Sequence, residues 1–169
     1  MSGGNMQKER AGSSLKLLPV HLYVLLHLKK AGVDYAKMMA KVSGLPVDLI
    51  NDAIKDLMEA GFIERDPGSA IKRSKARFKK AFEVHKHHTY YRLSRKGELF
   101  LRSFDPREYF NSLFPNGWEV VRGLAECKSV NELNLDGERV EELKIYRFIT
   151  EKGRKTEFFK VLTSFLSFR

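Results

Sequence analysis

The feature that most constrains the fold is an apolar stripe that stops abruptly, in residues 44–65. Its apolar residues share one face at helical spacing: Ile50, Ile54, Leu57 and Met58. Pro46 suits the first turn of this helix because it has no N–H to leave unpaired. Gly61 ends the pattern, and residues 62–65 then alternate as a short strand. The stripe therefore has to be buried by other elements of the same domain.

Two further helical patterns precede this one. Leu17 to Lys30 is rich in apolar residues and ends in two lysines before Gly32, which is a favourable helix stop. Asp34 is placed to cap a second short helix over residues 35–44, with Met38, Met39 and Val42 expected to face inward. After the first strand, Asp66-Pro67-Gly68 predicts a turn, and residues 88–94 (HTYYRLS) predict a β-rich return strand.

Three helices followed by a β-hairpin is the order of a winged helix-turn-helix, and residues 44–65 resemble the turn, recognition helix and first wing strand of MarR- and ArsR-like proteins. Residues 88–104 resemble the second wing strand and the helix after it. The resemblance implies an α+β, mostly helical winged-helix domain over residues 15–104, with a long basic wing at 66–88, in an archaeal branch of the superfamily. We expect residues 1–14 to be a flexible N-terminus.

A fainter copy of the same order follows in residues 105–169. Residues 117–134 are similar to a first helix, a break and a short second helix, and residues 148–151 (FITE) match FIER. Residues 152–155 (KGRK) predict a tight hairpin turn. We expect a second, degenerate winged-helix domain here; a helical dimerisation extension with an incidental hairpin is the alternative.

The net charge of +10 is concentrated in one part of the chain. Residues 66–102 carry a net charge of +8, whereas residues 1–65 carry +2 and residues 103–169 carry zero. A local excess of this size indicates a local polyanionic partner.

The cations predicted to contact nucleic acid lie in the wing and at its base. Wing cations suit phosphates along a groove, because they supply charge without reading bases. They are Lys72, Arg73, Lys75, Arg77, Lys79, Lys80, Lys86, Arg92, Arg95 and Lys96. A solvated charge run is the plainer interpretation. A third is a dimer arm, in which Phe78 and Phe82 of the wing cover a neighbouring hydrophobic face.

The predicted recognition helix departs from the usual DNA-reading composition. Asn51 and Lys55 are its candidate contacts, and Asn51 has the chemistry to read an adenine edge. Four carboxylates surround them: Asp48, Asp52, Asp56 and Glu59. Because carboxylates repel phosphate, sequence-specific reading of the major groove is not expected, and a protein-docking face remains the alternative.

Catalytic and metal-binding motifs are missing from the sequence. There is no Walker loop, G-x-G-x-x-G, G-x-S-x-G or H-E-x-x-H, so we expect no enzyme and no cofactor. His85 and His87 would share one face of a strand while His88 faces the other, so no metal site is expected. Cys127 is the single cysteine, which excludes an internal disulfide framework and favours a reducing, cytoplasmic setting. No apolar run is long enough to span a bilayer.

These features together predict a DNA-binding protein, a transcriptional regulator that binds mainly through its basic wing. The rival class is a protein-interaction adaptor that uses winged-helix surfaces for docking or dimerisation without reading DNA. The expected partner is double-stranded DNA, although the sequence does not separate DNA from RNA. A homodimer is compatible with the apolar first helix and C-terminus, and no small-molecule ligand or membrane partner is indicated.

Overall fold

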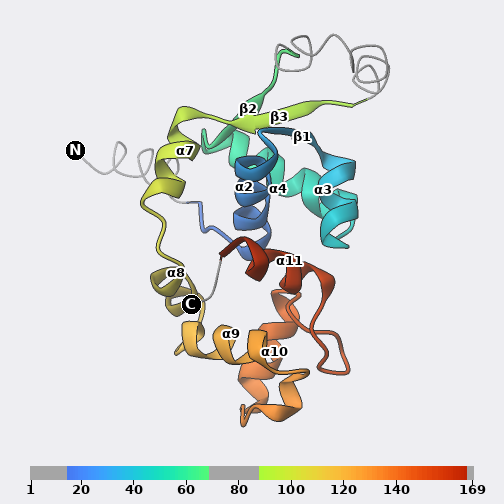
Figure 1. The fold of residues 1–169 in the computed structure, drawn as a ribbon, viewed down its shortest axis with the longest axis vertical. Coiled ribbons are helices and arrows are strands. Elements are labelled where there is room, and N and C mark those ends of the chain that lie inside the picture. The colour runs from blue at the N-terminus through green and yellow to red at the C-terminus, as the bar shows by residue number, and fades with distance from the viewer. Residues whose placement is uncertain (1–14, 69–87, 167–169) are drawn as a thin grey trace, which may run out of the picture. The chain divides into compact units, whose positions relative to one another are not determined.

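The computed structural model describes residues 15–68 and 88–166. This part of the chain is mostly helical with one small three-stranded antiparallel sheet, as expected for the α+β class. It divides into two compact units (Figure 1). The first unit takes its described residues from Met1–Lys41 and Leu45–Leu101, and the second from Val42–Gly44 and Arg102–Arg169.

The first unit begins with a helix, and a small sheet formed later in the chain packs on this helix. Its elements in chain order are α2 (Pro19–Ala31), β1 (Val33–Tyr35), α3 (Ala36–Ser43), α4 (Val47–Glu59), β2 (Ile63–Arg65) and β3 (Tyr90–Leu93), with α7 (Arg95–Arg102) following. The sheet order is β1-β3-β2, so the last strand lies between the other two. The register pairs Asp34 with Tyr91 and Ile63 with Leu93.

Strand β1 is the element that the sequence did not reveal. Asp34 was expected to cap a helix, but it lies within β1 and accepts a hydrogen bond from the Tyr35 N–H (2.9 Å). Its other oxygen lies 2.7 Å from Nε2 of buried His27. Val42 was expected to face inward and is 38% exposed, whereas Met39 is fully buried. A three-residue strand carries too little alternation to be detected by pattern.

Helix α2 is the centre of the first core. It packs on α4, β1 and β3, and its residues Leu22, Tyr23, Val24 and Leu25 are fully buried. A helix enclosed on this many sides must be apolar almost all round, which explains the dense apolar run in the sequence. The expected stripe of α4 is confirmed in its buried members, which are Ile50, Ile54 and Leu57.

The second unit is built from short helices around an aromatic core. Its elements are α8 (Pro106–Leu113), α9 (Gly117–Glu126), a 3₁₀ turn η1 (Val130–Glu132), α10 (Gly137–Ile145) and α11 (Glu157–Leu166). Phe148 is fully buried, and its ring lies 5.2 Å from that of Phe159 and 6.2 Å from that of Phe158. Two isolated antiparallel bridges, Ser129↔Arg154 and Ile149↔Lys155, replace a sheet in the described residues of this unit.

In the first unit, a defined set of hydrogen bonds links the end of α4 to the start of α7. The Phe62 N–H donates to the Leu57 carbonyl (2.9 Å), and the Ser94 N–H donates to the Phe62 carbonyl (3.0 Å). The Ser94 hydroxyl donates to the Gly61 carbonyl (2.6 Å) and accepts from the Gly97 N–H (3.1 Å). Ser94 thus caps α7 and ties it to the residue that ends α4.

The second unit repeats this scheme bond for bond between α10 and α11. The Phe148 N–H donates to Leu143 (2.9 Å), and the Thr156 N–H donates to Phe148 (3.0 Å). The Thr156 hydroxyl donates to the Arg147 carbonyl (2.6 Å) and accepts from the Phe159 N–H (3.1 Å). The bridge order also matches, since the last strand segment pairs with both earlier ones, as β3 does.

Candidate nucleic-acid interface

The basic segment, defined here as residues 69–87, joins the ends of β2 and β3. Its seven predicted contact cations, Lys72, Arg73, Lys75, Arg77, Lys79, Lys80 and Lys86, lie outside the residues that the structure describes. The structure does define both attachment points. Ile63 pairs with Leu93 and Arg65 with Tyr91, and the Asp66 N–H donates to the Tyr90 carbonyl (2.9 Å).

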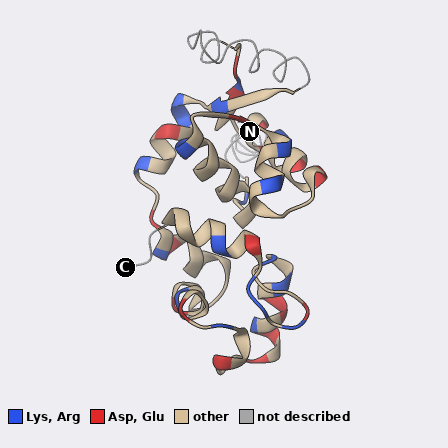
Figure 2. Ribbon diagram, turned by 45° about the vertical axis from the view of Figure 1, so that its right-hand side comes forward, with Lys and Arg blue, Asp and Glu red and all other residues tan. Residues whose placement is uncertain are grey.

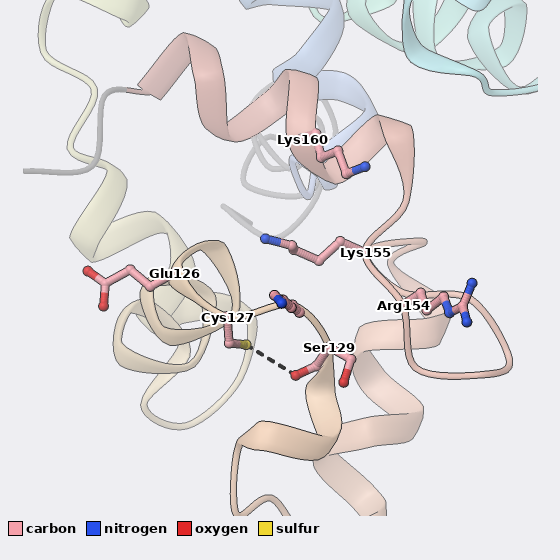
Figure 3. A pocket seen from close by; sticks show the side chains of 7 residues that line it. Glu126, Cys127, Ser129, Arg154, Lys155 and Lys160 are labelled. Atoms are coloured by element: carbon pink, nitrogen blue, oxygen red, sulfur yellow. Dashed lines mark hydrogen bonds between the residues drawn. The ribbon is translucent and has the colours of Figure 1, made fainter.

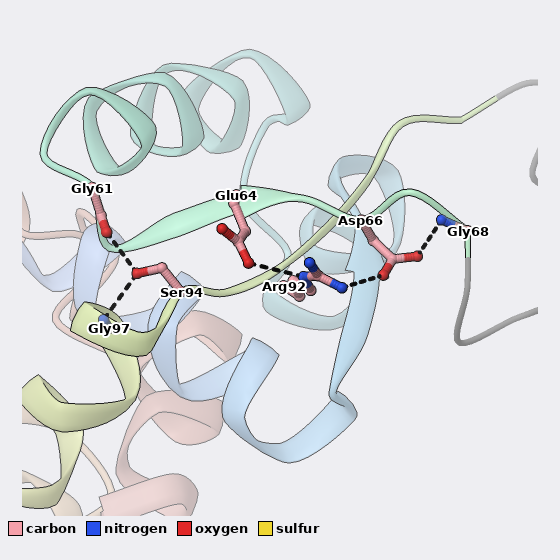
Figure 4. A network of polar contacts seen from close by, with 7 residues as sticks. All are labelled: Gly61, Glu64, Asp66, Gly68, Arg92, Ser94 and Gly97. Carbon is pink, nitrogen blue, oxygen red and sulfur yellow. Dashed lines mark hydrogen bonds and ion pairs between the residues drawn. The ribbon is translucent and has the colours of Figure 1, made fainter.

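Arg92 lies in an ion-pair network at this attachment (Figure 4). Its Nε donates to a Glu64 carboxylate oxygen (3.0 Å) and its NH1 lies 3.3 Å from Oδ1 of Asp66. The Asp66 side chain is fully buried, and its other oxygen accepts from the Gly68 N–H (2.8 Å). A buried carboxylate needs this cation, because removing the partner of a buried pair costs about 3–5 kcal/mol. Arg92 therefore stabilises the end of the hairpin, which weakens its candidacy as a phosphate contact.

Aromatic rings pack together where β3 begins, next to β1. The ring of His88 stacks on that of Tyr35 at 4.1 Å, and Tyr90 lies 5.2 Å from Tyr35. The pKa of Tyr90 is raised, first by burial and then by the neighbouring Tyr35 and Asp34, so its hydroxyl stays neutral at physiological pH. His88 is thus placed beside the β1 edge.

The two cations at the start of α7 have different environments. The Lys96 ammonium donates to the Ala60 carbonyl (2.6 Å) and lies 4.7 Å from the centre of the Phe62 ring. It caps the C-terminal end of α4, where a positive charge is favourable. Arg95 is exposed in the first turn of α7. Of the three predicted cations at the base, Arg95 is the one best placed to reach a phosphate.

Helix α4 presents Asn51 and Lys55 together on its exposed side, four residues apart. Asp48, Asp52 and Glu59 are exposed on the same helix. Asp56 is half exposed and lies 3.0 Å from Nε2 of buried His21. The exposed side of α4 is therefore acidic, as the sequence indicated, and Lys55 is its one cation.

The pairing of Asp66 with Arg92 and the placement of Arg65 were not predicted from the sequence. The Asp66–Arg92 pair joins positions 26 residues apart across the basic segment, and no local pattern connects them. Arg65 is exposed at the end of β2, next to the attachment, and its placement follows from strand register alone.

Two kinds of site are absent from the described ranges 15–68 and 88–166. No group of three or more His, Cys, Asp or Glu side chains there is arranged to hold a metal ion. No helix among these residues is long and apolar enough to cross a bilayer.

Comparison with known proteins gives one match. A family model described as an uncharacterized protein conserved in archaea (DUF2250) matches residues 13–104, more than half of the chain. The chain belongs to this family. The match to DUF2250 agrees with the archaeal origin expected from the sequence, and it covers the first unit. No curated protein and no solved structure matches the chain.

Proposed function

We propose that this DUF2250 protein is a winged-helix DNA-binding protein, acting in transcriptional regulation, whose basic segment is the wing. The element order α2–β1–α3–α4–β2–β3 and the sheet order β1-β3-β2 support the winged-helix assignment. In this assignment α4 is the recognition helix, and residues 102–166 form a second, degenerate winged helix that shares the hydrogen-bonding scheme of the first.

One observation carries the proposal: the most basic stretch of the chain is inserted at the tip of a hairpin with defined ends. Residues 69–87 contain seven Lys/Arg against Glu83 alone, a net charge of +6. Their attachment points are tied by the β2–β3 register and by the Asp66–Arg92 network. A cationic insert with anchored ends is suited to phosphate contacts along a groove.

The proposal assigns affinity to phosphates rather than to bases. The exposed side of α4 is acidic around Asn51 and Lys55, so its approach to a duplex is opposed by charge. Most of the binding free energy then comes from the basic segment and Arg95, and discrimination between sequences is modest.

The test is binding of a random double-stranded DNA fragment by the full chain at low salt. The variant replaces Lys72, Arg73, Lys75, Arg77, Lys79 and Lys80 by alanine. We expect it to lose at least about a hundredfold in affinity, because several phosphate contacts disappear together. Arg92 is left intact so that the buried Asp66 keeps its partner.

A matched control removes exposed cations elsewhere in the same unit. Lys29, Lys37 and Lys41 are all exposed, and their triple alanine variant should lose less than about tenfold in affinity. Equal losses in the two variants would show that only net charge matters, and absence of binding by the intact chain would refute the proposal.

A second candidate function, a protein-interaction adaptor, is favoured by the acidic exposed side of α4. Asp48, Asp52 and Glu59 would suit a basic protein partner rather than DNA. The same DNA titration separates the two functions, because an adaptor of this kind would not bind DNA. The Asp48→Asn/Asp52→Asn variant of such an adaptor would instead lose affinity for the protein partner.

A further inference from the structure

The second unit carries no net charge over residues 103–169, but its charges are separated. Residues 132–142 hold five acidic residues against Arg139, while residues 152–155 hold three cations and no acid. Figure 2 shows the acidic residues along α10 and basic residues on the hairpin before α11. The zero net charge of residues 103–169 therefore does not exclude a local cationic surface.

The fold brings cations from distant positions of the unit together. The antiparallel bridge Ser129↔Arg154, reinforced by the Val130 N–H donating to the Gly153 carbonyl (2.9 Å), places Lys128 beside the hairpin. These segments are about 25 residues apart in sequence, so no local run of charge in the sequence predicts that they lie together. Gly153 has φ +81°, and a Cβ there would lie 2.7 Å from Val130, so this close approach requires glycine.

A hollow of about 560 Å³ opens where these segments meet α11 (Figure 3). Its lining contains four cations and one carboxylate: Lys128, Arg154, Lys155, Lys160 and Glu126. Cys127 and Ser129 complete it. The volume lies within the range of small-ligand sites, and the lining offers no aromatic ring to hold a base or another flat group.

The cations of the hollow are only weakly neutralised by neighbours. Lys160 lies 3.9 Å from Glu157, a long and exposed pair that contributes little. The Lys155 ammonium donates to the Ala125 carbonyl (3.2 Å) and so spans from the hairpin to the end of α9. Arg154 and Lys128 enter none of the ion pairs found within residues 15–68 and 88–166. An excess of cations on the lining of one hollow favours the binding of an anion there.

We propose that this hollow is an anion site that binds a phosphate group. Lysine and arginine are the side chains that bind phosphate in proteins, the first as point charges and the second through a planar fork. A second, smaller hollow shares Lys155 and Lys160, so a ligand with two linked phosphates has cations along its length. The phosphate belongs either to a small phosphorylated molecule or to a nucleic-acid backbone.

Cys127 allows occupancy of this hollow to be measured directly. It is the single cysteine of the chain, it lines the hollow, and it is partly exposed. Its Sγ–H donates to the Ser129 carbonyl (3.2 Å). Alkylation by iodoacetamide, a neutral reagent, therefore reports on this position and on no other thiol.

The experiment follows the rate of Cys127 alkylation in the full chain at low salt, with inorganic pyrophosphate or double-stranded DNA added. The site predicts at least about threefold slower alkylation with pyrophosphate at millimolar concentration. Protection by DNA alone would assign the phosphate to a nucleic-acid backbone, and lack of protection by either would overturn the site.

A variant and a control separate this site from the basic segment. Lys128→Ala/Arg154→Ala/Lys160→Ala, which keeps Lys155 on its carbonyl, should weaken protection at least about tenfold. The control Lys29→Ala/Lys37→Ala/Lys41→Ala removes three exposed cations of the first unit and should not weaken it. Glu126→Gln removes the one carboxylate of the lining and should tighten binding about twofold to threefold, which a merely structural role does not predict. Equal protection in the pocket variant and the control would overturn the proposal. The six-cation variant of the basic segment should keep full protection by pyrophosphate, so this site and the proposed DNA binding fail independently.

Discussion

After helix α4 the chain passes through Gly61, and after helix α10 it passes through Arg147, at the same point of one hydrogen-bonding scheme. Both residues have positive φ, +83° at Gly61 and +63° at Arg147. In each unit the next residue is a phenylalanine that donates to the carbonyl five residues before it. The backbone geometry at this point is therefore the same in both units, whereas the side chains differ.

The divergence is clearest in what each unit inserts into its hairpin. The first unit separates its paired segments by the basic segment, and the second closes them with the short turn around Gly153. The first unit contains a three-stranded sheet, whereas the second has isolated bridges. Under the proposed function, the first unit carries its cations in this insert, whereas the second unit carries those of the proposed phosphate site on its short turn and on neighbouring segments.

The largest expected effect comes from the two equivalent phenylalanines. Phe148 is fully buried among aromatic rings, so Phe148→Ala should destabilise the second unit by about 3–5 kcal/mol. Phe62 is half-buried, and Phe62→Ala should cost the first unit about 1–2 kcal/mol. Urea unfolding followed by fluorescence of Trp118, the single tryptophan, reports on the second unit.

The predicted difference in stability between Phe148→Ala and Phe62→Ala can be contradicted by one result. Because Trp118 lies in the second unit, the two variants are compared by the far-ultraviolet circular dichroism transition, to which both units contribute. If this transition moved as far in Phe62→Ala as in Phe148→Ala, the two positions would not differ in burial as described. Circular dichroism in the same urea series checks that each variant folds.

The two positive-φ positions should respond in opposite directions. Gly61→Ala introduces a side chain at φ +83° and should cost about 1 kcal/mol, whereas Arg147→Gly relieves a strained residue and should gain up to about 1 kcal/mol. Thermal unfolding of both variants measures the difference. Two changes of the same sign would contradict the equivalence of these positions.

The alkaline stability of the second unit should depend on a buried tyrosine. Burial raises the pKa of Tyr109 far above its ordinary value, with a smaller contribution from Tyr146. Because the folded pKa is the higher one, this stabilisation is complete below the unfolded value of about 10 and is lost as pH rises above it.

Spectrophotometric titration of tyrosine, with Tyr109→Phe as the comparison, measures this effect. In the intact chain part of the tyrosine ionisation should coincide with the unfolding that the Trp118 signal reports, and Tyr109→Phe should reduce this part by one tyrosine. Ionisation of all six tyrosines near pH 10 in the folded protein would contradict the burial of Tyr109.

Much of the first unit was predictable from local pattern, because its signals are strong ones. The stripe of α4 and the stop at Gly61 predict the observed helix and strand within two residues. Strand β1 was missed since a three-residue strand is defined by its pairing with β3 rather than by its own composition. The Asp66–Arg92 pair was missed for the same reason, because its members meet only through register.

For the second unit, the order of elements could be predicted from the sequence, but the distribution of charge on its surface could not. The repeat of FIER in FITE led to the correct turn before α11, and α9 falls where a first helix was expected. The cations around Cys127 were not anticipated, because net charge over a segment says nothing of how the fold separates opposite charges. Whether residues 105–169 act as a second winged helix stays a prediction.

Binding of DNA phosphates by the basic segment should make the affinity strongly dependent on salt concentration. With about five phosphate contacts, the logarithm of the association constant should fall with the logarithm of salt concentration at a slope near −4 to −5. The six-cation variant keeps Lys86 and Arg95, so its slope should be no steeper than about −2. A slope unchanged by removing these cations, or an intact chain that binds no DNA at low salt, would contradict the claim.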